Sequence, residues 1–159
     1  MSISAVSSSL GLSALCVITL MSLVVVSHAD EKRTEVDRAQ QIVDVLKSRL
    51  AIAAEVTATV VPANDLLVSV KPVGDRTAAF ELSFEADFLA TLDDDDLQAV
   101  IAHELGHVWI FTHHPFLQTE RQANEVALRV VSRDSLERVY SKVWARGRSK
   151  GDPARFLGQ

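Results

Sequence analysis

The chain has 159 residues, enough for one small domain. Its formal net charge of −5 and its charged fraction of 23% are typical of a soluble globular protein. No basic stretch suggests nucleic-acid binding, so that class of function is excluded.

Residues 1–29 contain no Asp, Glu, Lys or Arg. Leu10–Val26 is largely apolar, and Ser27–Ala29 resembles the small-x-small site that signal peptidases cut. We therefore predict a secretory signal peptide, which places the mature protein outside the cell or in the periplasm. The alternative is an uncleaved membrane anchor, because about 17 apolar residues is the lower limit for a span. The only cysteine, Cys16, lies in this segment, so the domain that follows has no disulfide and no thiolate ligand.

The domain is predicted to occupy residues 30–145. Apolar side chains recur at three- and four-residue steps between Glu31 and Glu55, which predicts one long helix. Three short β-type runs follow, at Val56–Val61, Leu66–Val70 and Ala78–Phe84. Three short strands between helices indicate an α+β fold with a small antiparallel sheet.

Four consecutive aspartates, Asp93 to Asp96, precede the next apolar run. Their spacing does not fit a calcium-binding EF-hand loop, and no glycine lies among them. Carboxylates at this place can instead cap a helix, where they meet unpaired backbone N–H groups and the positive end of the helix dipole. We therefore predict that a helix begins here.

That helix, read over Leu97–Phe111, contains the motif H-E-x-x-H. His103 and His107 are four residues apart, so they lie on one face and can share a metal ion. Glu104 lies about 100° further round the helix and can reach a water on that metal. The plain alternative is two histidines that only pack or meet solvent. Because the surrounding residues are strongly apolar, burying these polar groups without a metal would be costly.

A catalytic zinc usually takes three protein ligands. His113 lies ten residues after His103, as in the metzincin pattern H-E-x-x-H-x-x-G-x-x-H. However, Ile110 stands where that pattern needs glycine, and the only methionines, Met1 and Met21, precede the domain. The metzincin interpretation is therefore rejected.

Glu120 is the better third ligand. Pro115 predicts that the first helix ends just before it, and Thr119 with Gln122 forms a capping box that begins a second helix. Glu120 then lies in the first turn, where the helix dipole favours an ionised carboxylate. Glu125 points toward another face and is the second choice.

Asp134–Ala145 is predicted to form a last helix with Leu136, Val139 and Val143 facing inward. Residues 146–159 are rich in basic and turn-forming residues, which predicts a flexible tail.

Two segments together resemble a zinc peptidase family. Leu97–His107 followed by Glu120–Ala127 looks like a gluzincin and is similar to the minimal peptidase domains of the HtpX/CAAX-prenyl-protease group. The element E-x-x-A-N also resembles ImmA/IrrE-type peptidases. The resemblance covers Asp94 to Val131, and it implies a zincin-like fold.

By this resemblance, His103, His107 and Glu120 would bind Zn²⁺, and Glu104 would be the catalytic base. Many such families have Asp where this chain has Asn124. Asn124 would then be a neutral hydrogen-bond acceptor that orients a ligand histidine. The membrane helices of full-length relatives are not part of the matched segments, so membrane association is expected only if residues 1–29 stay uncleaved.

The predicted function is an exported zinc metalloendopeptidase that acts on peptides or unfolded proteins. The strand that ends near Phe84 is expected to offer an edge for an extended substrate. His113, His114 and Tyr140 are candidates to stabilise the oxyanion, and the sequence does not choose among them. One alternative is a non-catalytic zinc-binding interaction module. Another is a membrane-associated structural protein in which the motif is accidental.

Overall fold

The computed structural model describes residue 30 and residues 33–74, 78–114 and 118–146. The predicted signal peptide, residues 1–29, lies outside these ranges. The chain divides into two compact units, residues 1–34 and residues 35–159. In the first unit the described residues are helical. None of the helices within the described ranges is long and apolar enough to cross a membrane.

A helix occupies residues 35–49 of the second unit. The prediction that it continues to Glu55 is wrong, because Glu55 already begins a strand. The helix ends where the N–H of Ile52 donates to the carbonyl of Lys47 (3.0 Å) and Ala51 adopts a φ of 55°. This ending usually contains glycine at the left-handed position. Alanine takes that position here, so the sequence lacks the usual stop signal.

In the part of the chain that the structure describes, three strands form one sheet: β1 (Glu55–Val61), β2 (Val68–Pro72) and β3 (Ala79–Glu85). Their order is β1-β3-β2, with β1 parallel and β2 antiparallel to β3. The α+β class is therefore correct, whereas the predicted antiparallel sheet is wrong: the sheet is mixed. The link at residues 62–67 is longer than a tight hairpin, and it carries the chain past the position that β3 later fills.

β3 is the central strand, so the prediction that it offers a free edge is also wrong. Its Phe80, Leu82 and Phe84 are buried, as their alternation predicted. The edge strand next to the helix with the motif is β2. Its apolar segment, Val68 to Val70, is short, and nothing in it indicates that β2 lies at the edge of the sheet.

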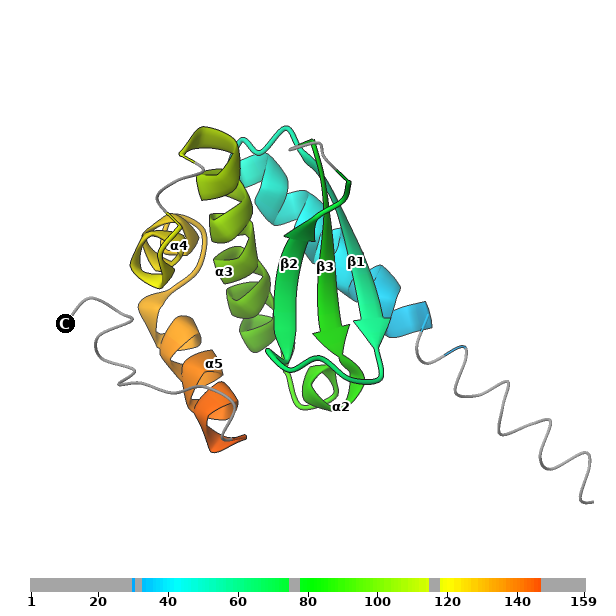
Figure 1. The fold of residues 1–159 in the computed structure, drawn as a ribbon. Helices are drawn as coiled ribbons and strands as arrows, with labels where there is room; N and C mark the ends of the chain where they lie inside the picture. Colours follow the sequence, from blue (N-terminus) through cyan, green and yellow to red (C-terminus); the bar gives the residue numbers. More distant parts are fainter. Residues whose placement is uncertain (1–29, 31–32, 75–77, 115–117, 147–159) are drawn as a thin grey trace, which may run out of the picture. The chain divides into compact units, whose positions relative to one another are not determined.

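Within the described residues four helices follow the sheet: α2 (Ala86–Leu89), α3 (Asp94–His113), α4 (Glu120–Ala127) and α5 (Arg133–Ala145). Helix α3 lies between the sheet on one side and α4 and α5 on the other (Figure 1). It is buried on most sides, which explains why its sequence is apolar almost all round.

Both predicted caps are confirmed. The carboxylate of Asp93 accepts the N–H of Asp96 (2.8 Å) at the start of α3. The hydroxyl of Thr119 accepts the N–H of Gln122 (3.2 Å) at the start of α4. These bonds satisfy N–H groups that a helix leaves unpaired, and they fix where the two helices begin.

The other aspartates of the run bind neighbouring helices. Asp94 accepts from Nε of Arg38 (2.9 Å), on the helix at residues 35–49. Asp96 is buried and forms ion pairs with Lys142 and, at 3.4 Å, with Arg138, both on α5. The aspartates therefore connect the start of α3 to helices on both sides, as well as capping it.

The predicted last helix is confirmed, with Leu136 and Val139 buried. Arg146, the first residue of the predicted tail, donates to the carboxylate of Glu85 (3.2 Å) and to the carbonyl of Asp87 (2.9 Å). The end of α5 is thus attached to the end of β3. Residues 147–159 lie outside the described ranges.

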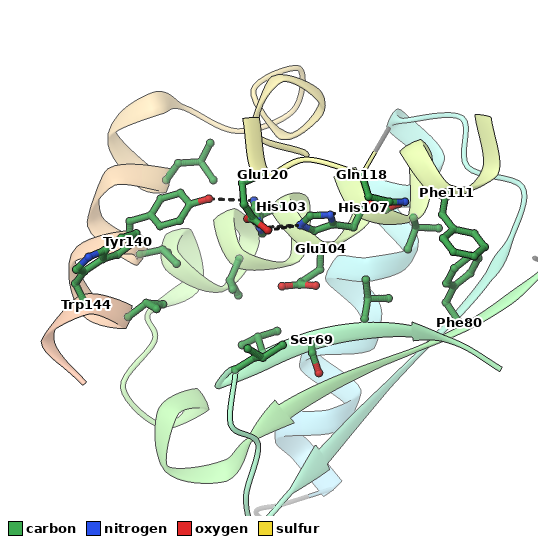
Figure 2. A pocket seen from close by; sticks show the side chains of 18 residues that line it. Ser69, Phe80, His103, Glu104, His107, Phe111, Gln118, Glu120, Tyr140 and Trp144 are labelled. Atoms are coloured by element: carbon green, nitrogen blue, oxygen red, sulfur yellow. Dashed lines mark hydrogen bonds and ion pairs between the residues drawn. The ribbon is translucent and has the colours of Figure 1, made fainter. Parts of the chain in front are cut away.

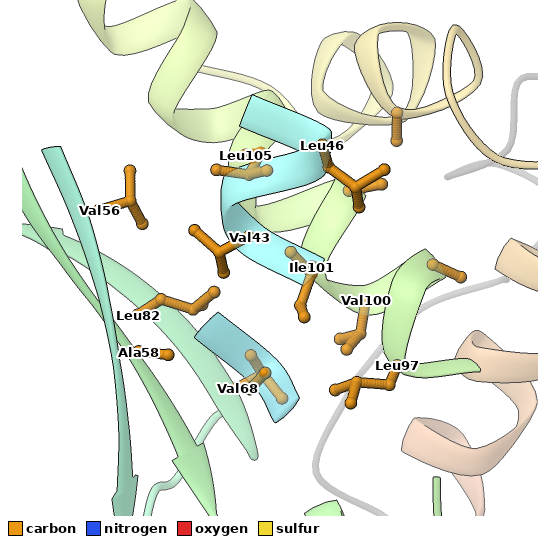
Figure 3. Close-up of a cluster of buried hydrophobic side chains, with 14 of the residues drawn as sticks. Val43, Leu46, Val56, Ala58, Val68, Leu82, Leu97, Val100, Ile101 and Leu105 are labelled. Atoms are coloured by element: carbon orange, nitrogen blue, oxygen red, sulfur yellow. The ribbon is translucent and has the colours of Figure 1, made fainter. Parts of the chain in front are cut away.

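The hydrophobic core lies between the helix at residues 35–49, the sheet and α3 (Figure 3). Val43 and Leu46 meet side chains of the sheet and of α3 there, and Ile101 and Leu105 contribute from α3. One side of α3 thus rests on the core, while the side that bears the histidines faces a cavity.

The backbones of helices α3 and α4 come close together at Gly106. A Cβ atom at this position would lie 2.8 Å from the Cα of Ala123 and closer still to its carbonyl oxygen. The backbone of α4 therefore occupies the space that any side chain at Gly106 would need. This contact sets the distance between the two histidines on α3 and Glu120, which lies one turn before Ala123.

We expect Gly106→Ala to destabilise the fold by about 1–3 kcal/mol, because α4 must move away from α3. Helix propensity alone predicts the opposite effect, because replacing glycine with alanine inside a helix raises the free energy of unfolding by about 1 kcal/mol. Urea unfolding measures the difference in the free energy of unfolding. A stabilised variant would show that the close contact does not constrain the two helices.

Candidate metal centre

The two histidines of the motif lie side by side on α3, facing the cavity. Their Nε2 atoms are 3.2 Å apart, and the rings meet edge to face. His103 and His107 are both partly buried, with 13% and 20% of their side chains exposed. The four-residue spacing therefore brings both imidazoles to one point, as the sequence predicted.

Helix α4 brings Glu120 to the same point. One carboxylate oxygen lies 3.1 Å from Nε2 of His103, and the other lies 3.5 Å from Nε2 of His107. Glu125, the second choice, points away and pairs with Arg121 (3.0 Å) on the exposed face of α4. Of the two glutamates, the structure brings only Glu120 to the histidines.

The outer nitrogens of both imidazoles meet amide oxygens. Nδ1 of His103 lies 2.8 Å from Oδ1 of Asn124, and Nδ1 of His107 lies 3.2 Å from Oε1 of Gln118. Because an oxygen of this kind only accepts, each Nδ1 carries the ring proton and each Nε2 presents its lone pair. Two lone pairs and the carboxylate of Glu120 therefore converge without a donor between them.

Such a cluster of acceptors needs a cation. A tetrahedral ion that binds nitrogen and oxygen at about 2.0–2.1 Å separates its ligand atoms by about 3.3 Å. The two imidazole nitrogens are 3.2 Å apart, and each has one of the two oxygens of Glu120 at 3.1 or 3.5 Å. With one ligand atom taken from each residue, all three lie within 4.8 Å of one another. Three ligands also leave one tetrahedral position for another molecule. His103, His107 and Glu120 can thus hold a metal ion.

In the metal-free protein a proton can take the place of the ion. Hydrogen bonds from His103 and His107 hold the pKa of Glu120 far below its usual range. Burial alone would lower the pKa of His107, but the hydrogen bond and charge of Glu120, together with the charge of Glu104, outweigh it and raise that pKa above 6.5. Metal and proton therefore compete for the same lone pairs.

Glu104 lies next to the histidines but does not belong to the cluster. It is buried, and its carboxylate points from α3 toward the edge strand, where it accepts the backbone N–H of Val70 (Figure 2). Burial raises the pKa of this carboxyl, and the two nearby histidines partly oppose that rise. The residue is placed to accept a proton from a molecule between the metal ligands and β2.

The histidines and both glutamates line a cavity of about 530 Å³. Apolar side chains form most of its walls (Figure 2). Phe80 and Phe111 pack edge to face on one side of the ligand cluster (5.6 Å between centroids). Tyr140 and Trp144 of α5 lie on the other side. Within the described residues the lining contains no Lys or Arg.

The structure distinguishes between the three candidates for stabilising an oxyanion. Tyr140 lines the cavity, and its hydroxyl donates to Oδ1 of Asn124 (2.9 Å). His113 stacks on Trp109 (4.2 Å between centroids) and contacts its carbonyl, and His114 also lies against Trp109. Neither His113 nor His114 is among the cavity-lining residues.

Two parts of the site, Gln118 and Val70, could not be recognised from the sequence alone. Gln118 holds the ring of His107 and also donates to its backbone carbonyl (3.3 Å). Its position just before the cap Thr119 was the only signal, because a helix that presents Glu120 to the histidines also brings the residue before its cap near them. Val70, whose N–H meets Glu104, became recognisable only once β2 was known to be the edge strand.

No protein-family model, curated protein or solved structure matches this chain. The metal-binding capacity therefore stands on the geometry of the ligand cluster, and the likeness to gluzincins rests on the two motif segments.

We expect the affinity for Zn²⁺ to fall as the pH drops below neutrality, because His107 must lose its proton before it can bind metal. Its raised pKa moves this loss to a higher pH than for an ordinary histidine, and at pH values below that pKa the affinity should fall up to about tenfold per pH unit for each proton released. Chelator competition between about pH 5.5 and 8 measures the effect.

Glu120→Gln serves as the control, since it removes the carboxylate that raises the pKa of His107. It should weaken Zn²⁺ binding at every pH and move the fall in affinity to lower pH. An affinity that stays constant across the range would contradict the assignment of His107 as a ligand.

Proposed function

We propose that the protein is a zinc-dependent endopeptidase. The observation that carries the proposal is the convergence of His103, His107 and Glu120 on one point, with the buried carboxylate of Glu104 beside it on the same cavity. A site that only bound metal for stability would not need Glu104, because a buried carboxyl that binds no metal is costly to maintain.

The ligand set favours zinc. Two imidazole nitrogens and one carboxylate oxygen, with a fourth position open, are the donor set of many catalytic zinc sites. Calcium and magnesium prefer an all-oxygen set, which this cluster does not offer. Bound zinc would lower the pKa of a coordinated water toward roughly 7 and polarise the carbonyl of the bond to be cleaved.

Glu104 supplies the proton transfer in this proposal. Its carboxylate accepts a proton from the attacking water and delivers it to the nitrogen of the departing amine. Burial raises the pKa of this carboxyl, which makes it a stronger base than an exposed glutamate. The hydrogen bond from Val70 fixes the carboxylate between β2 and the ligand cluster.

The cavity favours an extended peptide as substrate. In the described part of the chain β2 pairs with β3 on one side only, so backbone carbonyls on its other edge can accept hydrogen bonds from a substrate strand, while the N–H of Val70 on that edge is bound to Glu104. The apolar walls on both sides of the metal ligands favour apolar substrate side chains near the cleaved bond. Because the described lining has no Lys or Arg, it offers no ion pair to a terminal carboxylate, which supports endopeptidase over carboxypeptidase activity. Export still rests on the prediction for residues 1–29.

We expect Glu104→Gln to lower the turnover of a peptide library by about 10²–10⁴-fold, because the general base is lost. The Zn²⁺ content should stay at one ion per chain, since Glu104 is not a ligand. Glu125→Gln makes the same chemical change on the exposed face of α4 and should leave both properties unchanged. Equal turnover by Glu104→Gln and the natural protein would remove Glu104 as the base. Zinc binding without turnover in the natural protein would favour the non-catalytic zinc-binding module.

We also expect cleavage next to large apolar residues. Quenched peptides that carry Phe or Leu on either side of the cleaved bond should have kcat/KM values at least about tenfold above those with Asp or Lys, since burying an apolar side chain contributes about 1.5–3 kcal/mol. Amidating the peptide C-terminus should not change the rate. A rate that depends on a free C-terminal carboxylate would indicate a carboxypeptidase instead.

A further inference from the structure

Tyr140 reaches the metal site from α5, on the side of His103 that faces away from the other ligands. Its hydroxyl lies 2.9 Å from Oδ1 of Asn124 and 3.4 Å from Nδ1 of His103. Its ring packs edge to face against the imidazole of His103 (5.8 Å between centroids). Asn124 is almost fully buried, with 2% of its surface exposed, so its contacts are set by the protein.

The orientation of Asn124 decides which nitrogen of His103 carries the proton. An amide has one accepting oxygen and one donating NH₂ group. When the oxygen faces His103, the ring proton stays on Nδ1 and the lone pair of Nε2 points at the metal position. When the amide is rotated by half a turn, the NH₂ group donates to Nδ1, the proton moves to Nε2, and metal binding is blocked.

The phenol hydroxyl of Tyr140 favours the first orientation. A phenol is a strong donor and a weak acceptor, because its oxygen lone pair is delocalised into the ring. It therefore binds the amide oxygen in preference to the NH₂ group. The oxygen of Asn124 then accepts from both Tyr140 and His103.

We propose that Tyr140 is a positioning residue that holds the oxygen of Asn124 toward His103 and so keeps His103 in the tautomer that binds metal. The inference rests on the proposed zinc site. The hydroxyl of Tyr140 contacts Nδ1, whereas a substrate would lie on the Nε2 side of the ring, so this role differs from stabilising an oxyanion.

The test compares four proteins: the natural chain, Tyr140→Phe, Asn124→Asp, and the double variant. In the natural background, Tyr140→Phe should weaken Zn²⁺ binding about tenfold. In the Asn124→Asp background it should weaken binding less than about twofold, since a carboxylate has two equivalent oxygens and needs no partner to orient it. Competition with a chelating dye measures all four affinities as a double-mutant cycle.

A packing role for Tyr140 predicts a different result: the same loss of affinity in both backgrounds, which would overturn the inference. Ser141→Ala, which removes a hydroxyl from the exposed face of α5, is the matched control and should leave the affinity unchanged. Failure of the natural chain to bind Zn²⁺ at all would instead reject the proposed function.

A second measurement needs no metal. In the metal-free natural chain at alkaline pH, ¹⁵N NMR of His103 should show the proton on Nδ1. Tyr140→Phe should show a mixture of the two tautomers, and the double variant should again show the proton on Nδ1. An unchanged tautomer in Tyr140→Phe would overturn the inference even if the affinity fell.

Discussion

The constraint on which the site depends is the meeting of three acceptor atoms with no donor between them. Nε2 of His103, Nε2 of His107 and the carboxylate of Glu120 lie within 3.1–3.5 Å of one another. Such atoms repel unless a proton or a metal ion lies between them. The lowered pKa of Glu120 and the raised pKa of His107 both follow from the hydrogen bonds and opposite charges that the protonated histidines and this carboxylate share. The surrounding fold has to hold the cluster together when no metal is bound.

The fold meets this demand with rigid contacts at three places. Gly106 lets the backbone of α4 contact α3, and this contact fixes the distance between Glu120 and the two histidines. Thr119 fixes the residue at which α4 begins. The buried carboxylate of Asp96 attaches α5 to the start of α3 through Lys142, and α5 in turn carries the tyrosine that contacts the site. Each contact lies on a helix or at a helix cap, where side chains are positioned more precisely than on loops.

The sequence predicted the features that depend on local geometry. Because His103 and His107 are four residues apart on a helix, they must lie on the same face. The cap at Thr119 then predicted which glutamate would face them. It did not predict features set by distant contacts. The parallel pairing of β1 with β3 depends on how the chain passes the sheet, and no residue in β1 encodes it. The helix stop at Ala51 lacked the glycine that normally marks it.

The amide at Asn124 changes the charge balance of the site. Glu104 and Glu120 already place two carboxylates around the metal position, and an aspartate at position 124 would add a third in a nearly fully buried place. With Asn124, a dication and two carboxylates sum to zero, so the site carries no net charge when the metal is bound. The metal-free protein also has less repulsion to overcome. The amide, however, has two different ends, which a carboxylate does not. A donor such as the hydroxyl of Tyr140 therefore helps to fix which end of the amide faces His103.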